Sequence, residues 1–408
     1  MTAEKCCKPG KADKMKRKIL AVLVATALIA SLFTSCDSGT SSTASSSQQT
    51  SSVSDATDSS ASDNVSGNDE STDSSDSAES ADSKTDSGTS SDDTENQLTA
   101  DDMFSDRDLS GEYSECVDIM LNNSTASCSD SSVTVTDGSV TITKAGTYKL
   151  SGTFTGQIIV NAGDSDKVQL VLDNASITKD GSAALYVINA DKVFVTTVNG
   201  TENTLASTGE FASSDDETNI DGAVFSKSDI TFNGSGTLNV NCESKHGIVT
   251  KDDLKITGGT YNITSASQGL SGKDSVRIAG GNITVTSGTD GIHSENADDT
   301  EKGYVYISGG TVNITSGKDC IDASGTFTLN AGGGSSEKTT GDDSESYKGV
   351  KADGVLTISG GTFTIDTLDD AIHSNTDVTV TGGTFDISTG DDGIHADNNT
   401  VVSGGKML

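Results

Sequence analysis

Short segments in which hydrophobic and polar residues alternate recur from about residue 133 to the end of the 408-residue chain. In the segment VTVTGGTFDI (378–387), two valines share one face, a glycine pair follows, and a phenylalanine and an isoleucine again share one face. Alternation with a period of two is typical of a strand with one buried face. An acidic turn and Ile394 complete the unit, which therefore predicts three short strands joined by three turns.

The unit repeats at a nearly constant interval. Glycine pairs stand at 258–259, 280–281, 309–310, 360–361, 382–383 and 404–405. Three of the steps are 22 residues long, the step from 280 to 309 is longer by seven, and the interval from 309 to 360 fits two units plus a polar insert. Periods of this length indicate solenoids or propellers. Because no helical segment interrupts the strands, we predict an all-β parallel β-helix of about 22 residues per coil, with coils about 4.8 Å apart.

The segment before the repeat begins with a targeting signal. Residues 1–36 combine a short extension before Met15, a basic stretch, an apolar stretch and then Cys36. This pattern resembles a bacterial lipoprotein signal, with Cys36 as the lipidated residue, and ordinary secretory cleavage near Ser35 is the alternative. The signal predicts an extracellular protein that is anchored to the cell membrane through its lipid.

Three further regions follow the signal. Residues 37–97 are almost only small polar and acidic residues, which cannot bury apolar area and therefore predict a disordered linker. Residues 98–132 form a lead-in segment, and residues 133–408 form the β-helix domain. The last unit ends midway through a coil, so we expect the C-terminal end of the domain to be truncated.

Charge and cysteine content narrow the possible partners. The formal net charge of −35 argues against nucleic acid, and it favours cations, neutral ligands, or anionic ligands held through a bridging metal. Among the cysteines beyond the signal, Cys116 and Cys128 are close enough in sequence for a disulfide. Cys242 and Cys320 fall within repeat units and are expected to face the core as free thiols.

One acidic turn occurs three times, as GTDGIHSEN (288–296), LDDAIHSN (368–375) and TGDDGIHAD (389–397). Because the motif recurs coil after coil, its first interpretation is architectural. Aligning the units places three sets of residues at equivalent positions, namely Asp290, Asp319, Asp369 and Asp391 in the turn, Ile292, Ile321, Ile372 and Ile394 in the core, and His293, Asp322, His373 and His395 pointing outward.

Stacked carboxylates in these turns predict a cation site. Two aspartates on consecutive coils lie about 5 Å apart and repel by roughly 1 kcal/mol in water. Calcium takes six to eight oxygen ligands and reverses the sign of this interaction. We therefore predict bound calcium, with metal-ligating candidates Asp290, Asp319, Asp369, Asp370, Asp391 and Asp392. The alternative is that Asp-Gly only makes good turns and solvent screens the charge. Zinc between histidines is less favoured, because the surrounding ligands are mostly oxygen.

Several motifs together resemble one known family. They are AGTYKLSGT, DKVQLVLDNASIT, TENTL, HGIVTKDDLKITGGTYNIT, KGVKADGVLTISGGT and TGDDGIHAD, and they are spread over residues 140–408. The chain is similar to the carbohydrate-binding β-helix family of clostridial cell-surface proteins, whose shape is similar to that of pectate lyases. The resemblance implies a right-handed β-helix that binds plant polysaccharide, with cellulose and polygalacturonate as the family's ligands, and that binds calcium.

The same residues bear on whether the protein is an enzyme. A calcium-dependent lyase needs a strong base beside the metal, yet only Arg277 of the three arginines lies in the repeats, and Lys348 and Lys351 are the better candidates. The segment GKDCID (317–322) faintly resembles a polygalacturonase motif, but the companion Arg-Ile-Lys segment is absent. We therefore predict a monomeric binding protein without catalytic residues. A pectate lyase or polygalacturonase, and a structural adhesin or spacer, are the alternatives.

The position of the glycan on the surface is not predicted. The chain has no tryptophan, so the substitutes for an aromatic sugar platform are Tyr261, Tyr304, Tyr306 and Tyr347. A face of threonine, serine and asparagine side chains offers hydrogen bonds along many coils, but such residues are also ordinary solvent-facing strand positions.

Overall fold

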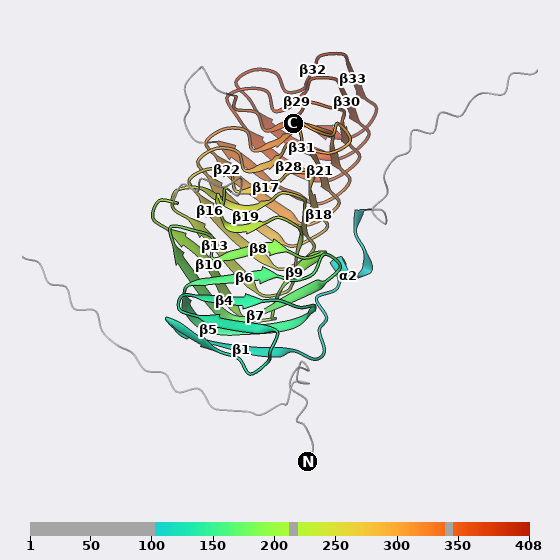
Figure 1. Ribbon diagram of the computed structural model, residues 1–408. Helices are drawn as coiled ribbons and strands as arrows, with labels where there is room; N and C mark the ends of the chain where they lie inside the picture. Colours follow the sequence, from blue (N-terminus) through green and yellow to red (C-terminus); the bar gives the residue numbers. More distant parts are fainter. Residues whose placement is uncertain (1–102, 212–218, 339–345) are drawn as a thin grey trace, which may run out of the picture. The chain divides into compact units, whose positions relative to one another are not determined.

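A computed structural model describes residues 103–211, 219–338 and 346–408 (Figure 1). The signal, Cys36 and the linker over 37–97 lie outside these residues. In the described part the only helix is α2 (Asp106–Leu109), and no helix there is long and apolar enough to cross a membrane.

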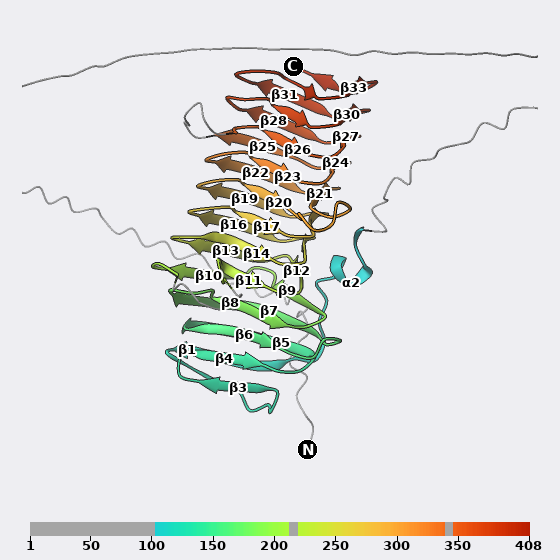
Figure 2. The same cartoon turned by 45° about the horizontal axis from the view of Figure 1, so that its top comes forward.

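The strands form three stacks that run the length of the solenoid (Figures 1 and 2). From β9 onward each strand pairs in parallel with the strand three places further along the chain, as three strands per coil require. Two stacks belong to a sheet of 22 strands, which we call the larger sheet, and one belongs to a sheet of 12 strands, the smaller sheet.

The first stack of the larger sheet contains β9 (Lys192–Thr197), β12 (Asp229–Gly234), β15 (Asp253–Ile256), β18 (Ser275–Ile278), β21 (Tyr304–Ile307), β24 (Phe327–Leu329), β27 (Leu356–Ile358), β30 (Asp377–Val380) and β33 (Asn399–Val402). The second stack contains β10 (Glu202–Thr208), β13 (Thr237–Cys242), β16 (Thr260–Ser265), β19 (Asn282–Ser287), β22 (Thr311–Ser316), β25 (Gly333–Lys338), β28 (Thr362–Asp366), β31 (Thr384–Ser388) and β34 (Lys406–Met407).

The smaller sheet contains β3 (Val133–Thr136), β4 (Ser139–Ile142), β6 (Gln157–Asn161), β8 (Leu185–Asn189), β11 (Gly222–Ser226), β14 (His246–Thr250), β17 (Leu270–Gly272), β20 (Ile292–Ser294), β23 (Ile321–Ala323), β26 (Val350–Ala352), β29 (Ile372–Ser374) and β32 (His395–Ala396). The larger sheet begins with β1 (Val117–Asn123), β2 (Thr125–Ser127), β5 (Gly146–Thr155) and β7 (Lys167–Asp180).

The larger sheet starts within residues 98–132, the segment predicted to be a lead-in. Strand β1 pairs in parallel with β5, with Val117 opposite Tyr148. A boundary at residue 133 is therefore too late, because β1 alternates weakly in sequence and its partner lies about 30 residues further along the chain. Most strand pairs are parallel, and the result is an all-β, solenoid-like fold of the β-helix type.

The register between coils follows the repeat. Tyr261 lies opposite Ile283, and Phe363 lies opposite Phe385, and each pair is separated by 22 residues. Ile278 lies opposite Ile307, which is 29 residues further along, because the polar segment between β20 and β21 adds a loop. Insertions are accommodated in this way at the turns, where they do not disturb the stacked strands.

The core consists of hydrophobic columns inside the three stacks. Alternation leaves one face of each strand buried, as in β16 and β19, where every second side chain is shielded from solvent. One continuous cluster of buried hydrophobic residues extends from Ile119 to Phe385. Each fully buried aliphatic side chain stabilises the fold by about 1.5–3 kcal/mol. Cys242 and Cys320 are buried free thiols in this core, as expected. Cys128 is also free, so the disulfide between Cys116 and Cys128 is not formed.

The two glycines of each pair meet two different requirements. The second glycine, such as Gly383 with φ of 96°, adopts a left-handed conformation that side chains disfavour. A Cβ on the first glycine, Gly382, would collide with the carbonyl oxygen of Ser359 in the preceding coil. The pair therefore recurs because the turn needs both positive φ and close contact between coils.

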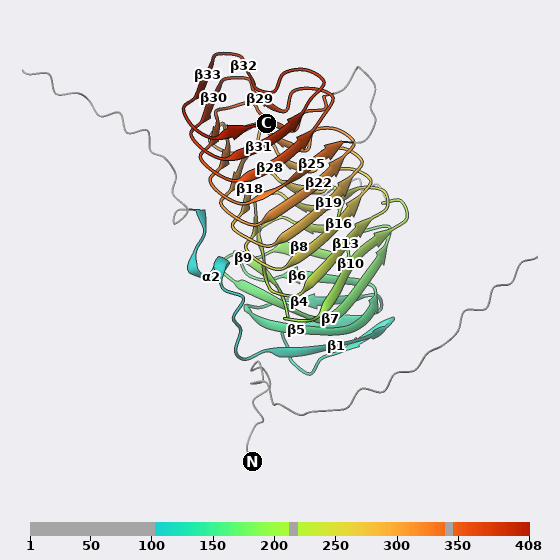
Figure 3. The ribbon, with the colours of Figure 1, turned by 180° about the vertical axis from the view of Figure 1, so that it is seen from behind.

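Residues 103–112, which we call the N-terminal strap, lie against the outside of the larger sheet, where α2 contacts β12. Figure 3 shows α2 at the edge of the solenoid, near β9. Met103 and Phe104 pack on Tyr306. Asp108, only 1% exposed, accepts from Lys192 Nζ at 2.6 Å and from Thr231 Oγ1 at 2.7 Å. The strap thus links coils that are far from it in sequence.

Candidate functional site

The acidic turns lead into the strands of the smaller sheet, which stack in the order β20, β23, β26, β29 and β32. Ile292, Ile321 and Ile372 are at most 1% exposed and form the expected core column, together with Val350. Ile394, near the end of the chain, is partly buried. The next residue of each strand faces outward and is partly exposed.

The register of the turns differs from the expected alignment by one residue. Strand pairing places Lys348 between Asp319 and Asp370, and Asp392 follows. Asp370 and Asp392, rather than Asp369 and Asp391, are therefore equivalent to Asp290 and Asp319. The doubled aspartates misled the alignment, because either one fits the turn when the residues are compared by type alone.

The outward column contains His293, Asp322, Lys351, His373 and His395 in consecutive coils. Asp322 accepts from Lys351 Nζ at 2.9 Å and lies 3.2 Å from His293 Nδ1. The rings of His373 and His395 stack with centroids 4.9 Å apart and planes 11° apart. His246, the fourth histidine, is not in this column, because it stands two residues before Ile248, at the position that Asp290 occupies.

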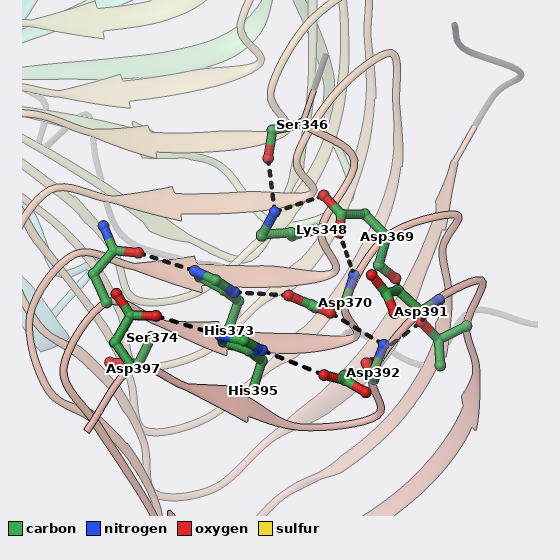
Figure 4. Close-up of polar contacts among 12 residues, drawn as sticks. Ser346, Lys348, Asp369, Asp370, His373, Ser374, Asp391, Asp392, His395 and Asp397 are labelled. Atoms are coloured by element: carbon green, nitrogen blue, oxygen red, sulfur yellow. Dashed lines mark hydrogen bonds and ion pairs between the residues drawn. The ribbon is translucent and has the colours of Figure 1, made fainter. Parts of the chain in front are cut away.

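Each histidine near the end of the chain is held by the aspartate three residues before it (Figure 4). Asp370 Oδ2 lies 2.7 Å from His373 Nδ1, and Asp392 Oδ2 lies 3.3 Å from His395 Nδ1. The hydrogen bonds that His395 makes to Asp392 and then to Asp397 raise its pKa. The repeated Asp-x-x-His spacing therefore orients imidazole rings on the surface, which is an architectural role that the turn can fill in every coil.

A cluster of carboxylates adjoins these histidines. Asp369, Asp370 and Asp391 each offer an oxygen within 4.8 Å of the others. The cluster is partly satisfied by the protein, since Lys348 Nζ lies 2.5 Å from Asp369 Oδ2 and the Asp392 backbone N–H donates to Asp370 Oδ1 at 3.1 Å. Burial would raise the pKa of Asp369, but the hydrogen bond from Lys348 lowers it overall. This oxygen-only set suits a hard cation, although Lys348 already supplies one positive charge.

The other predicted metal ligands have different surroundings. Asp290 groups with His293 and Asp322 within 4.8 Å. Asp319 is buried, and its Oδ1 accepts from the Lys348 backbone N–H at 2.6 Å and from Ser346 Oγ at 2.8 Å. The structure therefore brings Asp369, Asp370 and Asp391 together, and it places Asp319 and Asp392 outside that oxygen cluster.

A second acidic cluster, which was not predicted from the sequence, lies beside the larger sheet. Asp229, Asp252 and Asp253 come within 4.8 Å of one another and line a cavity of about 530 Å³ with Arg277 and Tyr304. Burial, together with Asp229 and then Asp274, raises the pKa of Asp252 to about 7. The adjacent acids in KDDLKI were the only available signal, since Asp229 comes from the preceding coil.

The lysine and tyrosine side chains predicted as a catalytic base or a sugar platform are mostly buried or paired with other residues. Burial would lower the pKa of Lys351, but its hydrogen bond to Asp322 raises it overall, so the amine stays protonated. Tyr261 lies in the core, and Tyr306 and Tyr347 are also buried, so these three cannot stack on a sugar. Tyr304 is half-buried, and the Arg277 guanidinium lies 5.1 Å from the centre of its ring.

Comparison with known proteins assigns the family. A family profile for carbohydrate-binding domain-containing proteins matches residues 136–393. A carbohydrate-binding domain-containing protein from Acetivibrio thermocellus is 41% identical over 221 residues, which are 54% of this chain and 75% of the relative. A solved polysaccharide lyase-like protein from C. thermocellum, a gadolinium derivative, is 36% identical and superposes with a TM-score of 0.55 over 60% of this chain and 97% of that one. This chain therefore belongs to the carbohydrate-binding domain-containing protein family.

Proposed function

We propose that the chain is a right-handed parallel β-helix, with about 22 residues in its regular coils, that binds plant cell-wall polysaccharide along the outer face of the smaller sheet. The observation that carries this proposal is the outward column from His293 to His395, which presents one polar or charged side chain per coil. Coils about 4.8 Å apart match a polymer that repeats its hydroxyl groups along its length. Cellulose-like and polygalacturonate-like chains are the candidates.

We further propose that calcium binds at Asp369, Asp370 and Asp391. With one oxygen from each, the three carboxylates supply three of the six to eight oxygens that calcium takes, so turn carbonyls, water or glycan oxygens complete the shell. Calcium would also supply the positive charge that a polyanionic glycan needs near a protein of net charge −35. Lys348 competes with the ion, because its ammonium lies 2.5 Å from Asp369.

Binding is favoured over catalysis for two reasons. The Asp-x-x-His unit occurs in several coils, whereas a catalytic centre is needed once. Lys348 and Lys351, the candidate bases, form ion pairs with Asp369 and Asp322, and the hydrogen bond to Asp322 raises the pKa of Lys351 overall. The likeness to a polysaccharide lyase-like protein makes lyase activity the alternative function.

The test measures calcium affinity by isothermal titration calorimetry. Asp391→Asn should weaken binding by about tenfold or more, because it removes one of three carboxylates. Asp386→Asn is the matched control, since Asp386 is an exposed carboxylate on strand β31 outside the cluster. Lys348→Gln should strengthen calcium binding by removing the competing charge. Equal affinities in all four proteins would contradict the assigned site.

The same proteins should be tested for binding to pectate with and without EDTA, and for release of unsaturated or reducing ends. We expect EDTA and Asp391→Asn to abolish pectate binding, with no turnover by any variant. Binding that survives both treatments would contradict calcium bridging. Turnover that is lost in Lys348→Gln would favour the lyase alternative.

We also propose that the chain is an extracellular lipoprotein, anchored through Cys36, with residues 37–97 as a spacer and no further membrane contact. The acidic, apolar-poor composition of the spacer supports this proposal, because like charges extend such a chain away from the membrane.

A further inference from the structure

A polar pocket of about 360 Å³ opens on the smaller sheet, over β11, β14, β17 and β20. Its lining includes Asp221, His246, Lys251, Gln268, Ser271 and His293. The volume lies in the range of small-molecule sites, and the lining mixes donors and acceptors rather than gathering one charge. This pocket lies apart from the carboxylate cluster at Asp369, Asp370 and Asp391.

Asp221 gives the pocket a weakly paired acceptor. Its Oδ1 is buried and has no hydrogen-bond partner among the residues that the structure describes. Its Oδ2 lies 3.7 Å from Lys251 Nζ, too far for a good hydrogen bond. Because Oδ1 is shielded from solvent, Oδ2 is the oxygen that can accept a hydrogen bond from a ligand hydroxyl, and its weak contact with Lys251 leaves it free to do so.

His246 gives the pocket a defined donor. Its Nδ1 accepts from the Gln268 backbone N–H at 3.1 Å, so a neutral ring carries its proton on Nε2. Burial lowers the pKa of His246, against the opposing effect of Asp221, and keeps the ring neutral near pH 7. A donor on His246 and an acceptor on Asp221, in one pocket, match the paired hydroxyls of a sugar.

The charges around the pocket are close to balanced. Lys251 and Lys273 face Asp221, Glu295 and Asp298, and Lys273 Nζ lies 2.8 Å from Asp298 Oδ2. A polyanionic ligand would gain little electrostatic stabilisation in this pocket, because the ammonium groups of Lys251 and Lys273 each already have a carboxylate nearby. An uncharged ligand with several hydroxyls avoids this competition and still meets the polar groups of the lining.

We propose that this pocket binds one neutral pyranose unit of a polysaccharide, with Asp221 Oδ2 accepting from a hydroxyl and His246 Nε2 donating to an oxygen of the same unit. The proposal rests on the proposed carbohydrate-binding function and adds a subsite that needs no calcium. His293 lines the pocket and also begins the outward column with Asp322. A glycan seated in the pocket can therefore continue along that column, so the pocket sets where the chain begins.

The test uses cellohexaose, with xylohexaose and mannohexaose as further neutral probes, in the presence of EDTA. Binding is followed by NMR of the four histidine rings, and affinity is measured by calorimetry. We expect the His246 resonances to shift on binding, and Asp221→Asn to weaken affinity about tenfold, or about 1.4 kcal/mol. Asp386→Asn serves as the control that leaves affinity unchanged.

A second variant guards against misfolding of the first. Ser271 faces outward in β17, so Ser271→Trp should fill the pocket and abolish binding without lowering the melting temperature. The proposal is overturned if no neutral oligosaccharide binds, if binding leaves His246 unshifted, or if both variants bind within twofold of the wild type. If these experiments reject the pocket but pectate binding still depends on Asp391, the proposal of calcium-dependent binding stands. If cellohexaose binding depends on Asp221 and EDTA has no effect on pectate binding, the pocket proposal stands and calcium bridging is rejected.

Discussion

Replacing Asp108 by Asn tests whether a buried charge holds the N-terminal strap to the solenoid. The Asp108 carboxylate lies 2.6 Å from Lys192 Nζ and 3.6 Å from Lys255 Nζ, and all three side chains are at most 10% exposed. Burial alone would raise the pKa of Asp108, but the hydrogen bonds from Lys192, Thr231 and Ser105 hold it well below the usual range.

The expected loss is set by two competing effects. Removing one partner of a buried ion pair costs about 3–5 kcal/mol, because the other charge is left uncompensated. The strap contains few residues, however, so it can detach and let Lys192 and Lys255 regain water. Detachment gives up the burial of Met103 and Phe104, about 1.5–3 kcal/mol each. We therefore expect a loss of about 3 kcal/mol, or a fall in Tm of roughly 6–12 °C.

The measurement combines urea unfolding with amide hydrogen exchange in the strap. Asp106→Asn is the control, because Asp106 lies in the same first turn of α2 but is exposed. Since the folded pKa of Asp108 is lowered, its contribution is complete above the unfolded pKa of about 3.9 and is lost as pH falls below it. The difference between wild type and Asp108→Asn should therefore shrink on acidification below pH 4. If the two variants unfold within about 0.5 kcal/mol of each other at pH 7, the reasoning is refuted.

Two further predictions concern the histidine column and the anchor. Burial would lower the pKa of His293, but Asp322 and Asp290 raise it overall, so Asp322→Asn should lower the pKa that NMR titration measures for His293. Because the folded pKa is raised, the stabilisation that His293 provides is present below its unfolded pKa and disappears as pH rises through the folded pKa, and an unchanged titration would reject the pairing. Cys36→Ala should abolish labelling with radioactive palmitate and move the protein to the soluble fraction, and labelling that persists in the variant would show that the anchor lies elsewhere.

Binding and lyase activity make different demands on one lysine of the acidic cluster. The chain has the family's carbohydrate-binding domain over residues 136–393, and its solved relative is polysaccharide lyase-like. Lys348 is the residue on which the alternatives differ most clearly. It is a competitor of calcium in a binding protein and a candidate base in a lyase, so Lys348→Gln has opposite consequences in the two cases.

The sequence alone determined the strand pattern, the core columns and the glycine turns. Period-two alternation specifies which side of a strand is buried, whatever lies around it. The glycine pairs report a backbone conformation and a close contact between coils, both of which recur in every regular coil. Ile292, Ile321 and Ile372 were therefore assigned correctly to the core from their spacing. The buried thiols Cys242 and Cys320 followed from the same pattern.

Only the tertiary structure decided which polar groups meet. Backbone pairing between coils placed Lys348 between Asp319 and Asp370. The same stacking brought Asp229 to Asp252 and Asp253, and packing of the N-terminal strap on the larger sheet brought Asp108 to Lys192 and Lys255. Such contacts depend on how many residues each loop inserts between coils. Alternation is a local property of the chain, whereas lateral contacts in a solenoid are fixed by hydrogen bonds between strands that are 20 or more residues apart.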